Sequence, residues 1–172
     1  ERASLEGGKA LSVKEVERTL EHSLYVGGQP VTLSGIVDRV DRYDGDLRIV
    51  DYKSGVVEQT DLNFENYSDL VLNPKKAKAF QLMTYAYLYY QHYEQDSNFF
   101  LAGNYALRNL TNGIVFVNQK RSLLQINTLV IEEFESQLKK LVSLILDEEQ
   151  FFFPTDDVSA CQWCDFKTVC GR

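Results

Sequence analysis

Residues 35–55 read GIVDRVDRYDGDLRIVDYKSG, and this stretch decides the fold. Over residues 31–43 the apolar side chains tend to alternate with Thr, Ser and Asp, which is the period-two pattern of a β-strand. Asp44 and Gly45 then predict a tight hairpin turn, because both residues tolerate a positive φ. Residues 46–53 resume as a second strand, so the sequence predicts two neighbouring antiparallel strands.

Three charged residues of this hairpin form a candidate site. Asp51 and Lys53 are two residues apart in the second strand, so their side chains are expected on the same face, and Tyr52 on the opposite, packed face. If Asp38 pairs across the hairpin on the face of Asp51, two carboxylates and one ammonium group converge.

Hydrolysis of a phosphodiester bond requires groups of this kind. Carboxylate oxygens can hold one or two Mg²⁺ ions, which polarise the phosphate and lower the pKa of an attacking water. A lysine can orient that water or stabilise the charge that develops on the phosphorus centre.

Two other interpretations of these residues stay open at this stage. An isolated Asp-x-Lys is common on the exposed face of an edge strand, so the tripeptide alone is weak evidence. The acidic run Asp38, Asp41, Asp44 and Asp46 could suggest calcium. However, its spacing differs from that of an EF-hand loop, and a strand places the first two on opposite faces.

The rest of the chain predicts an α/β fold, with a mixed twisted sheet flanked by two helices. Residues 14–21 are compatible with either a helix or a leading strand, and the polar residues 54–73 predict a loop with one short helical turn. The expected helices cover residues 75–91 and 128–149, and further strands cover 98–108 and 113–117, joined by a turn at 109–112. The last helix has an apolar stripe, expected in the core: Ile131, Phe134, Leu138, Leu141 and Ile145.

The composition is that of one globular domain covering residues 1–172. It has no apolar run long enough to span a membrane and no signal-peptide pattern, so a cytoplasmic location is expected. The formal net charge of -7 argues against nonspecific binding of nucleic acid, although bound divalent ions would offset part of it. The missing initiator Met suggests a fragment of a longer protein.

The cysteines gather at the carboxy-terminal end, in a tail at residues 155–172. Cys161, Cys164 and Cys170 form an odd, clustered set in a chain without a secretory signal. This arrangement favours a metal site over a disulfide framework.

Three motifs in a fixed order resemble a known family. They are GIVDRVD at residues 35–41, LRIVDYKSG at 47–55 and QLMTY at 81–85. Together they resemble the PD-(D/E)XK nuclease superfamily, specifically the RecB-like branch of RecB- and AddB-type helicase-nucleases and CRISPR-adaptation exonucleases. The resemblance extends from residue 31 to the carboxy terminus and implies a restriction-endonuclease-like core.

The resemblance implies a role for each motif residue. Asp38 and Asp51 match the metal-binding carboxylates and Lys53 matches the catalytic lysine, while Tyr52 would offer its backbone carbonyl to the metal. Further along, the Q-x-x-x-Y motif matches the sequence from Gln81 onward.

The helix that carries this last motif supplies further candidates. Gln81 and Tyr85 are four residues apart, so both would face the active site from one side of the helix. Lys75, Lys76 and Lys78, at the start of the helix, are candidate contacts to a DNA backbone, and a solvated basic turn is the equal alternative.

The cysteine spacing C-x₂-C-x₅-C also matches this branch. In such relatives three thiolates and a fourth, upstream cysteine hold a structural [4Fe–4S] cluster. The sequence has only three cysteines, so the cluster is assigned to the longer parent protein. The upstream metal-ligand histidine of many relatives is not assigned to His22 or His92, and Glu17 or Glu21 could contribute a carboxylate.

The sequence thus predicts Mg²⁺- or Mn²⁺-dependent cleavage of DNA, acting as an exonuclease on single strands supplied by a helicase module of the same polypeptide or complex. Two alternatives stay open: a noncatalytic nucleic-acid-binding or assembly domain with the nuclease fold, and a stand-alone CRISPR-type exonuclease.

Overall fold

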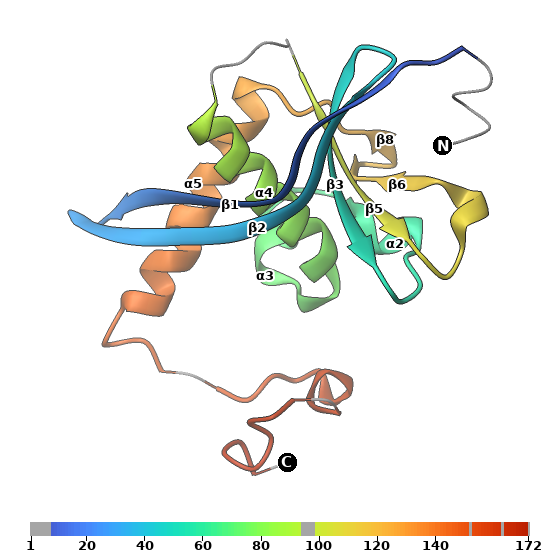
Figure 1. The fold of residues 1–172 in the computed structure, drawn as a ribbon. Helices are drawn as coiled ribbons and strands as arrows, with labels where there is room; N and C mark the ends of the chain where they lie inside the picture. Colours follow the sequence, from blue (N-terminus) through green and yellow to red (C-terminus); the bar gives the residue numbers. More distant parts are fainter. Residues whose placement is uncertain (1–7, 94–98, 152, 163, 172) are drawn as a thin grey trace.

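The computed structural model describes residues 8–93, 99–151, 153–162 and 164–171. Its main sheet has five strands in the order β1-β2-β3-β5-β6 (Figure 1). These strands are Leu11–Val26, Gln29–Tyr43, Asp46–Lys53, Leu101–Ala106 and Ile114–Phe116. A small second sheet joins β4, β7 and β8, at Asn63–Phe64, Asn118–Gln119 and Ser122–Leu123.

The hairpin predicted from the sequence is confirmed. Strands β2 and β3 pair antiparallel, with Tyr43 opposite Asp46, and both turn residues have a positive φ, +54° at Asp44 and +94° at Gly45. Strand β3 then pairs parallel with β5, which pairs antiparallel with β6. The sheet is therefore mixed, as the sequence predicts.

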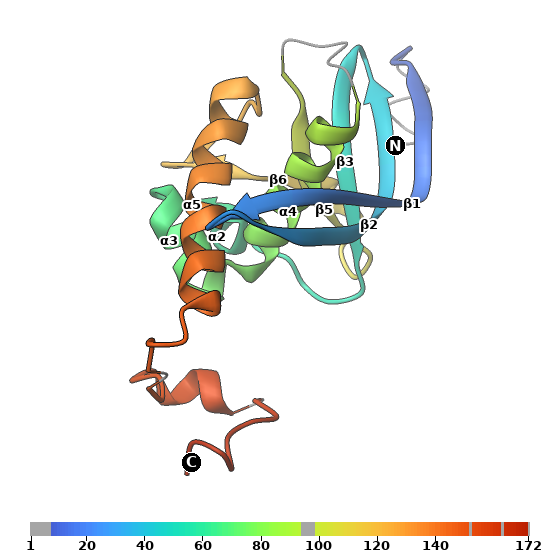
Figure 2. The ribbon, with the colours of Figure 1, turned by 90° about the vertical axis from the view of Figure 1, so that its left-hand side faces the viewer.

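Strand β1 settles the open assignment of residues 14–21, which form part of a 16-residue strand. It pairs with β2 along nearly its whole length and turns back through Gly27 and Gly28, both with positive φ. In Figures 1 and 2 this long hairpin bends away from the rest of the sheet and crosses α4 and α5.

Helix α4, at Ala77–His92, forms the centre of the core. It contacts β1, β2, β3 and β5 on one side and α5, at Thr128–Leu146, on another. Five of its six buried residues follow the three- and four-residue spacing of one helix face, and Leu88 widens that face: Ala79, Leu82, Met83, Ala86, Tyr87 and Leu88. A 3₁₀ turn at Pro74–Lys76 leads into α4, so the regular helix begins two residues later than the sequence predicts.

Two expectations need correction. Residues 54–73 do not form a loop with one helical turn, because they contain α2 at Gln59–Leu62, strand β4 and α3 at Tyr67–Leu72, each of which buries side chains. In α5, Ile145 is 59% exposed and the helix ends at Leu146 rather than at residue 149. The last turn of α5 extends beyond the core toward the carboxy-terminal tail (Figure 1).

Within the described ranges, no helix is both long and apolar enough to cross a membrane.

Candidate active site

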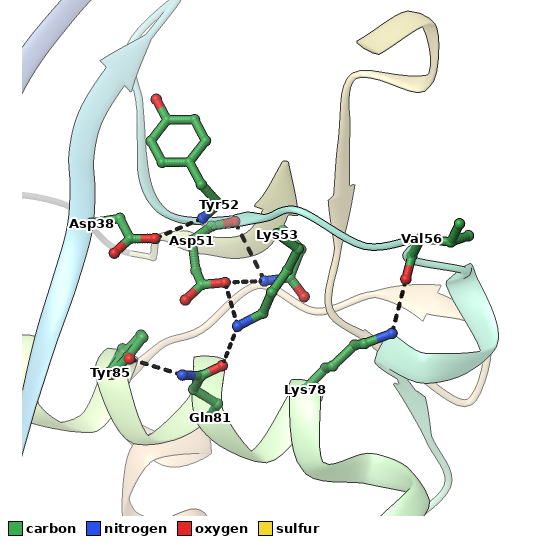
Figure 3. A network of polar contacts seen from close by, with 9 residues as sticks. Asp38, Asp51, Tyr52, Lys53, Val56, Lys78, Gln81 and Tyr85 are labelled. Atoms are coloured by element: carbon green, nitrogen blue, oxygen red, sulfur yellow. Dashed lines mark hydrogen bonds and ion pairs between the residues drawn. The ribbon is translucent and has the colours of Figure 1, made fainter. Parts of the chain in front are cut away.

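The register of the hairpin brings the two candidate carboxylates together. Arg39 pairs with Val50, so the next step along both strands places Asp38 opposite Asp51. Oδ2 of Asp38 accepts a hydrogen bond of 2.7 Å from the backbone N–H of Tyr52, which fixes that carboxylate against β3 (Figure 3).

A chain of polar contacts connects β3 to α4. Nζ of Lys53 lies 2.8 Å from Oδ2 of Asp51 and donates to Oε1 of Gln81 at 2.6 Å. Nε2 of Gln81 in turn donates to the hydroxyl of Tyr85 at 2.9 Å. Figure 3 shows Gln81 and Tyr85 pointing from one side of α4 toward the end of β3. The structure therefore brings together all five side chains that the motifs single out.

Asn104 joins this site, although no motif in the sequence points to it. It lies on β5 directly beside Asp51 in the parallel register, and it is fully buried. Its Nδ2 donates to Oδ2 of Asp51 at 2.8 Å, while its Oδ1 has no hydrogen-bond partner within the described part of the chain. Asp51 is thus held from two directions, by Lys53 and by Asn104.

Burial and charge act on Asp51 in opposite directions. The residue is only 4% exposed, and this burial raises the pKa of its carboxyl above the usual value. The contacts with Lys53 and Asn104 lower the pKa, and the negative charge of Asp38 raises it. The net effect is a raised pKa, because burial and repulsion between the carboxylates outweigh the contacts with Lys53 and Asn104.

Tyr52 differs from the sequence expectation, which places its ring in a packed layer. The side chain is 38% exposed, and its hydroxyl accepts a hydrogen bond of 2.8 Å from Nη1 of Arg39. Helices α4 and α5 lie on one side of the sheet (Figure 2), and Tyr52 points to the other side. The face opposite the candidate site is therefore not covered by these helices.

Asp41 lies on that opposite face and has a structural role. It is fully buried, with Oδ1 2.7 Å from Nε of Arg48 and Oδ2 2.8 Å from Nε of Arg39. The acidic run from residue 38 to 46 is thus divided between two faces of the sheet, as strand geometry predicts.

Gly35 allows the hairpin to approach α4 closely. A Cβ atom at this position would lie 2.9 Å from Cε1 of Tyr85 and 3.3 Å from Cδ1 of Leu88. Because real Cβ contacts are not that short, any larger residue would displace the Tyr85 ring. Gly35 of the first motif therefore leaves the space that the ring of Tyr85, the last residue of the third motif, occupies.

A comparison with models of known protein families identifies the family of this chain. A family model described as PD-(D/E)XK nuclease superfamily matches residues 2–171. The chain belongs to the PD-(D/E)XK nuclease superfamily. Members of this superfamily are typically phosphodiesterases that use a divalent metal, and their restriction-endonuclease-like fold agrees with the mixed sheet and flanking helices found here.

The other comparisons add little. No curated protein matches the sequence. Among solved structures, the crystal structure of SSO0001 is similar at 15% identity and a TM-score of 0.47, with 98% of this chain and 64% of that chain covered. This chain thus spans less than two thirds of SSO0001.

The donor atoms of this candidate site fit a hard divalent cation. Within the described residues, no group of three or more His, Cys, Asp or Glu side chains is placed to hold a metal. Two facing carboxylates are nevertheless what Mg²⁺ commonly takes from a protein, because it keeps several waters and binds substrate phosphate as well. The repulsion between Asp38 and Asp51 that raises the pKa of Asp51 would be relieved by a cation. A contribution from the backbone carbonyl of Tyr52 stays a prediction.

The three candidate DNA-binding lysines all have partners within the chain. Lys75 forms an ion pair of 3.3 Å with Asp157, and Lys76 donates to the backbone oxygen of Thr60 at 3.0 Å. Lys78 contacts Asp61 at 2.6 Å. Their role in DNA binding stays a prediction.

The remaining candidates lie outside the cluster. Cys161 ends a 3₁₀ turn at Val158–Cys161, and Cys164 and Cys170 follow it in the tail, which leads away from the core (Figure 1). His22 lies on β1, where its ring forms a T-shaped contact with the ring of Tyr87, with 5.6 Å between the ring centroids. The proposed iron–sulfur cluster stays a prediction.

Proposed function

We propose that this chain is a Mg²⁺- or Mn²⁺-dependent deoxyribonuclease that acts as an exonuclease on single-stranded DNA in repair or recombination. We further propose that it is the nuclease domain of an AddB- or RecB-like protein working with a helicase module. The observation that carries the proposal is the position of the Lys53 ammonium, held by Asp51 and Gln81 on the face where Asp38 and Asp51 oppose each other.

Each residue of the site has a distinct task in this proposal. Asp38 and Asp51 would hold the divalent ion, which supplies Lewis-acid activation of the phosphate and lowers the pKa of a bound water. Lys53 orients the attacking water and stabilises the negative charge that builds up on the phosphate oxygens as the P–O bond breaks. Because Gln81 fixes the ammonium group, little reorganisation is needed during the reaction.

Tyr85 supports the same arrangement as a neutral donor. Burial raises the pKa of its phenol, and the charges of Asp51 and Asp38 raise it further, so the hydroxyl stays protonated at neutral pH. Since it accepts the hydrogen bond from Gln81, its own proton is left for a substrate oxygen.

Metal dependence provides the direct test of this proposal. We expect the chain to degrade an end-labelled single-stranded oligonucleotide with Mn²⁺ or Mg²⁺, and to lose that activity with excess EDTA. A circular single strand of the same composition should resist, because an exonuclease needs a free end. Cleavage that persists in EDTA would contradict the metal site, and cutting of the circle would contradict the exonuclease assignment.

Replacing Asn104 with alanine should weaken metal use without abolishing the reaction. Loss of the 2.8 Å hydrogen bond leaves Oδ2 of Asp51 held by Lys53 without its second partner. Removing such an outer partner typically costs about 10–100-fold in metal affinity or activity. We therefore expect the Mn²⁺ concentration for half-maximal rate to rise by about that factor, while Asn112→Ala, at an exposed position, leaves it unchanged. An unaltered Mn²⁺ dependence in Asn104→Ala would rule out this positioning role.

The tail cysteines support an iron–sulfur cluster in the parent protein. We propose that Cys161, Cys164 and Cys170 supply three thiolates and that a cysteine outside this sequence supplies the fourth. A parent protein purified without oxygen should then show iron–sulfur absorption that is lost when Cys164 is replaced by serine.

A further inference from the structure

A pocket adjoins the active site between α4 and the long β1–β2 hairpin. Its volume is about 490 Å³, within the range of small-molecule sites. Ser34 and Gly35 of β2 form one wall, and Ala77 and Phe80 of α4 form another. None of these four belongs to the catalytic residues proposed above.

Two residues belong to both the pocket and the active site. Gln81 and Tyr85 line the pocket, and they are also the residues that connect α4 to Lys53. The pocket therefore lies next to the Lys53 ammonium, with Gln81 and Tyr85 between them. In a nucleic acid strand, the groups attached next to a phosphate are a sugar and its base.

The lining of the pocket suits a base better than a phosphate. Most of its exposed surface is apolar, and Phe80 supplies an aromatic ring. Lys78, a cation in the lining, is already engaged by Asp61 at 2.6 Å and by the backbone oxygen of Val56 at 3.0 Å. Aromatic and apolar side chains bind bases of any sequence, because each base has a π-face.

We propose that this pocket takes the unpaired nucleobase adjacent to the scissile phosphate. The inference rests on the proposed nuclease function and gives it a structural basis for preferring single strands. A base inside a duplex is paired and stacked, so it can enter such a pocket only after it is unpaired and turned out, which costs free energy. A single strand avoids most of that cost.

Filling the pocket tests the inference without disturbing the core. Phe80 is a poor target for substitution because its ring also packs against the buried ring of Phe134, with 5.9 Å between the ring centroids. Ala77 is exposed, so Ala77→Trp places a large ring in the pocket at little cost to folding. Thr19→Trp provides the matched control, since Thr19 is exposed on the same hairpin and outside the pocket lining.

Binding is measured in the Lys53→Ala background, so that no cleavage interferes. The probes are a short fluorescent oligothymidylate and an abasic strand of equal length, which keeps the phosphates and lacks the bases. We expect about tenfold or greater preference for the strand with bases. Ala77→Trp should remove most of this preference while affinity for the abasic strand stays unchanged, and Thr19→Trp should keep it.

The outcomes separate this inference from the proposed function. Equal binding of both strands, or a preference that Ala77→Trp leaves intact, overturns the base pocket even if the chain cuts DNA. Conversely, a preference that depends on the pocket in a chain that never cuts DNA supports the pocket and contradicts the nuclease proposal.

Discussion

Replacing Lys53 with alanine is expected to slow Mn²⁺-dependent cleavage of single-stranded DNA by about 10²–10³-fold or more. Removal of one preorganised group that stabilises developing charge typically has an effect of this size. In this chain the ammonium is fixed by contacts of 2.8 Å with Asp51 and 2.6 Å with Gln81, so its position is set before substrate binds. Initial rates at saturating Mn²⁺ provide the measurement.

Lys139→Ala provides the control for a lost lysine. Lys139 lies on α5, away from the site, and forms an ion pair with Glu135 one turn earlier on the same helix. That variant should cut at the parental rate. A Lys53→Ala chain that is folded by circular dichroism and still cuts at the parental rate would exclude Lys53 from the reaction.

Replacing Asp41 with alanine should lower the free energy of unfolding by about 3–5 kcal/mol. The carboxylate is fully buried and accepts 2.7 and 3.1 Å contacts from Arg48 and a 2.8 Å contact from Arg39. Its removal takes a carboxylate partner from two nearly buried guanidinium groups. Urea denaturation followed by circular dichroism measures the change.

The neighbouring Asp46→Ala distinguishes burial from simple loss of charge. Asp46 begins β3 in the same hairpin and is exposed. Its replacement should change stability by less than about 0.5 kcal/mol, as is usual at surface positions. Similar losses in the two variants would show that the buried ion pairs of Asp41 contribute little.

The relative positions of site residues that are close in the sequence can be predicted from the sequence alone. A two-residue turn sets the register of the hairpin, and that register places Asp38 against Asp51. The strand period places Lys53 on the same face as Asp51, and a helical step of four places Gln81 above Tyr85. These relations depend on near neighbours in the chain, so pattern alone predicts them.

Long-range relations could not be predicted in this way. Asn104 reaches Asp51 only because β5 pairs parallel with β3 across a separation of 53 residues, and no local pattern specifies that pairing. The exposed ring of Tyr52 depends on which face of the sheet the helices cover. The buried side chains of residues 59–72 lie in elements too short to show a period.

The Asp51→Asn variant tests whether the Asp51 carboxylate serves in metal-dependent cleavage of DNA. The measurement is the initial rate at which the chain degrades end-labelled single-stranded DNA with Mn²⁺, compared between the parent sequence and this variant. We expect cleavage by the parent and a loss of about 10²-fold or more in the variant, since the amide keeps the shape of the side chain but not its charge. Equal rates, or a folded parent chain that does not cut DNA at all, would contradict this role.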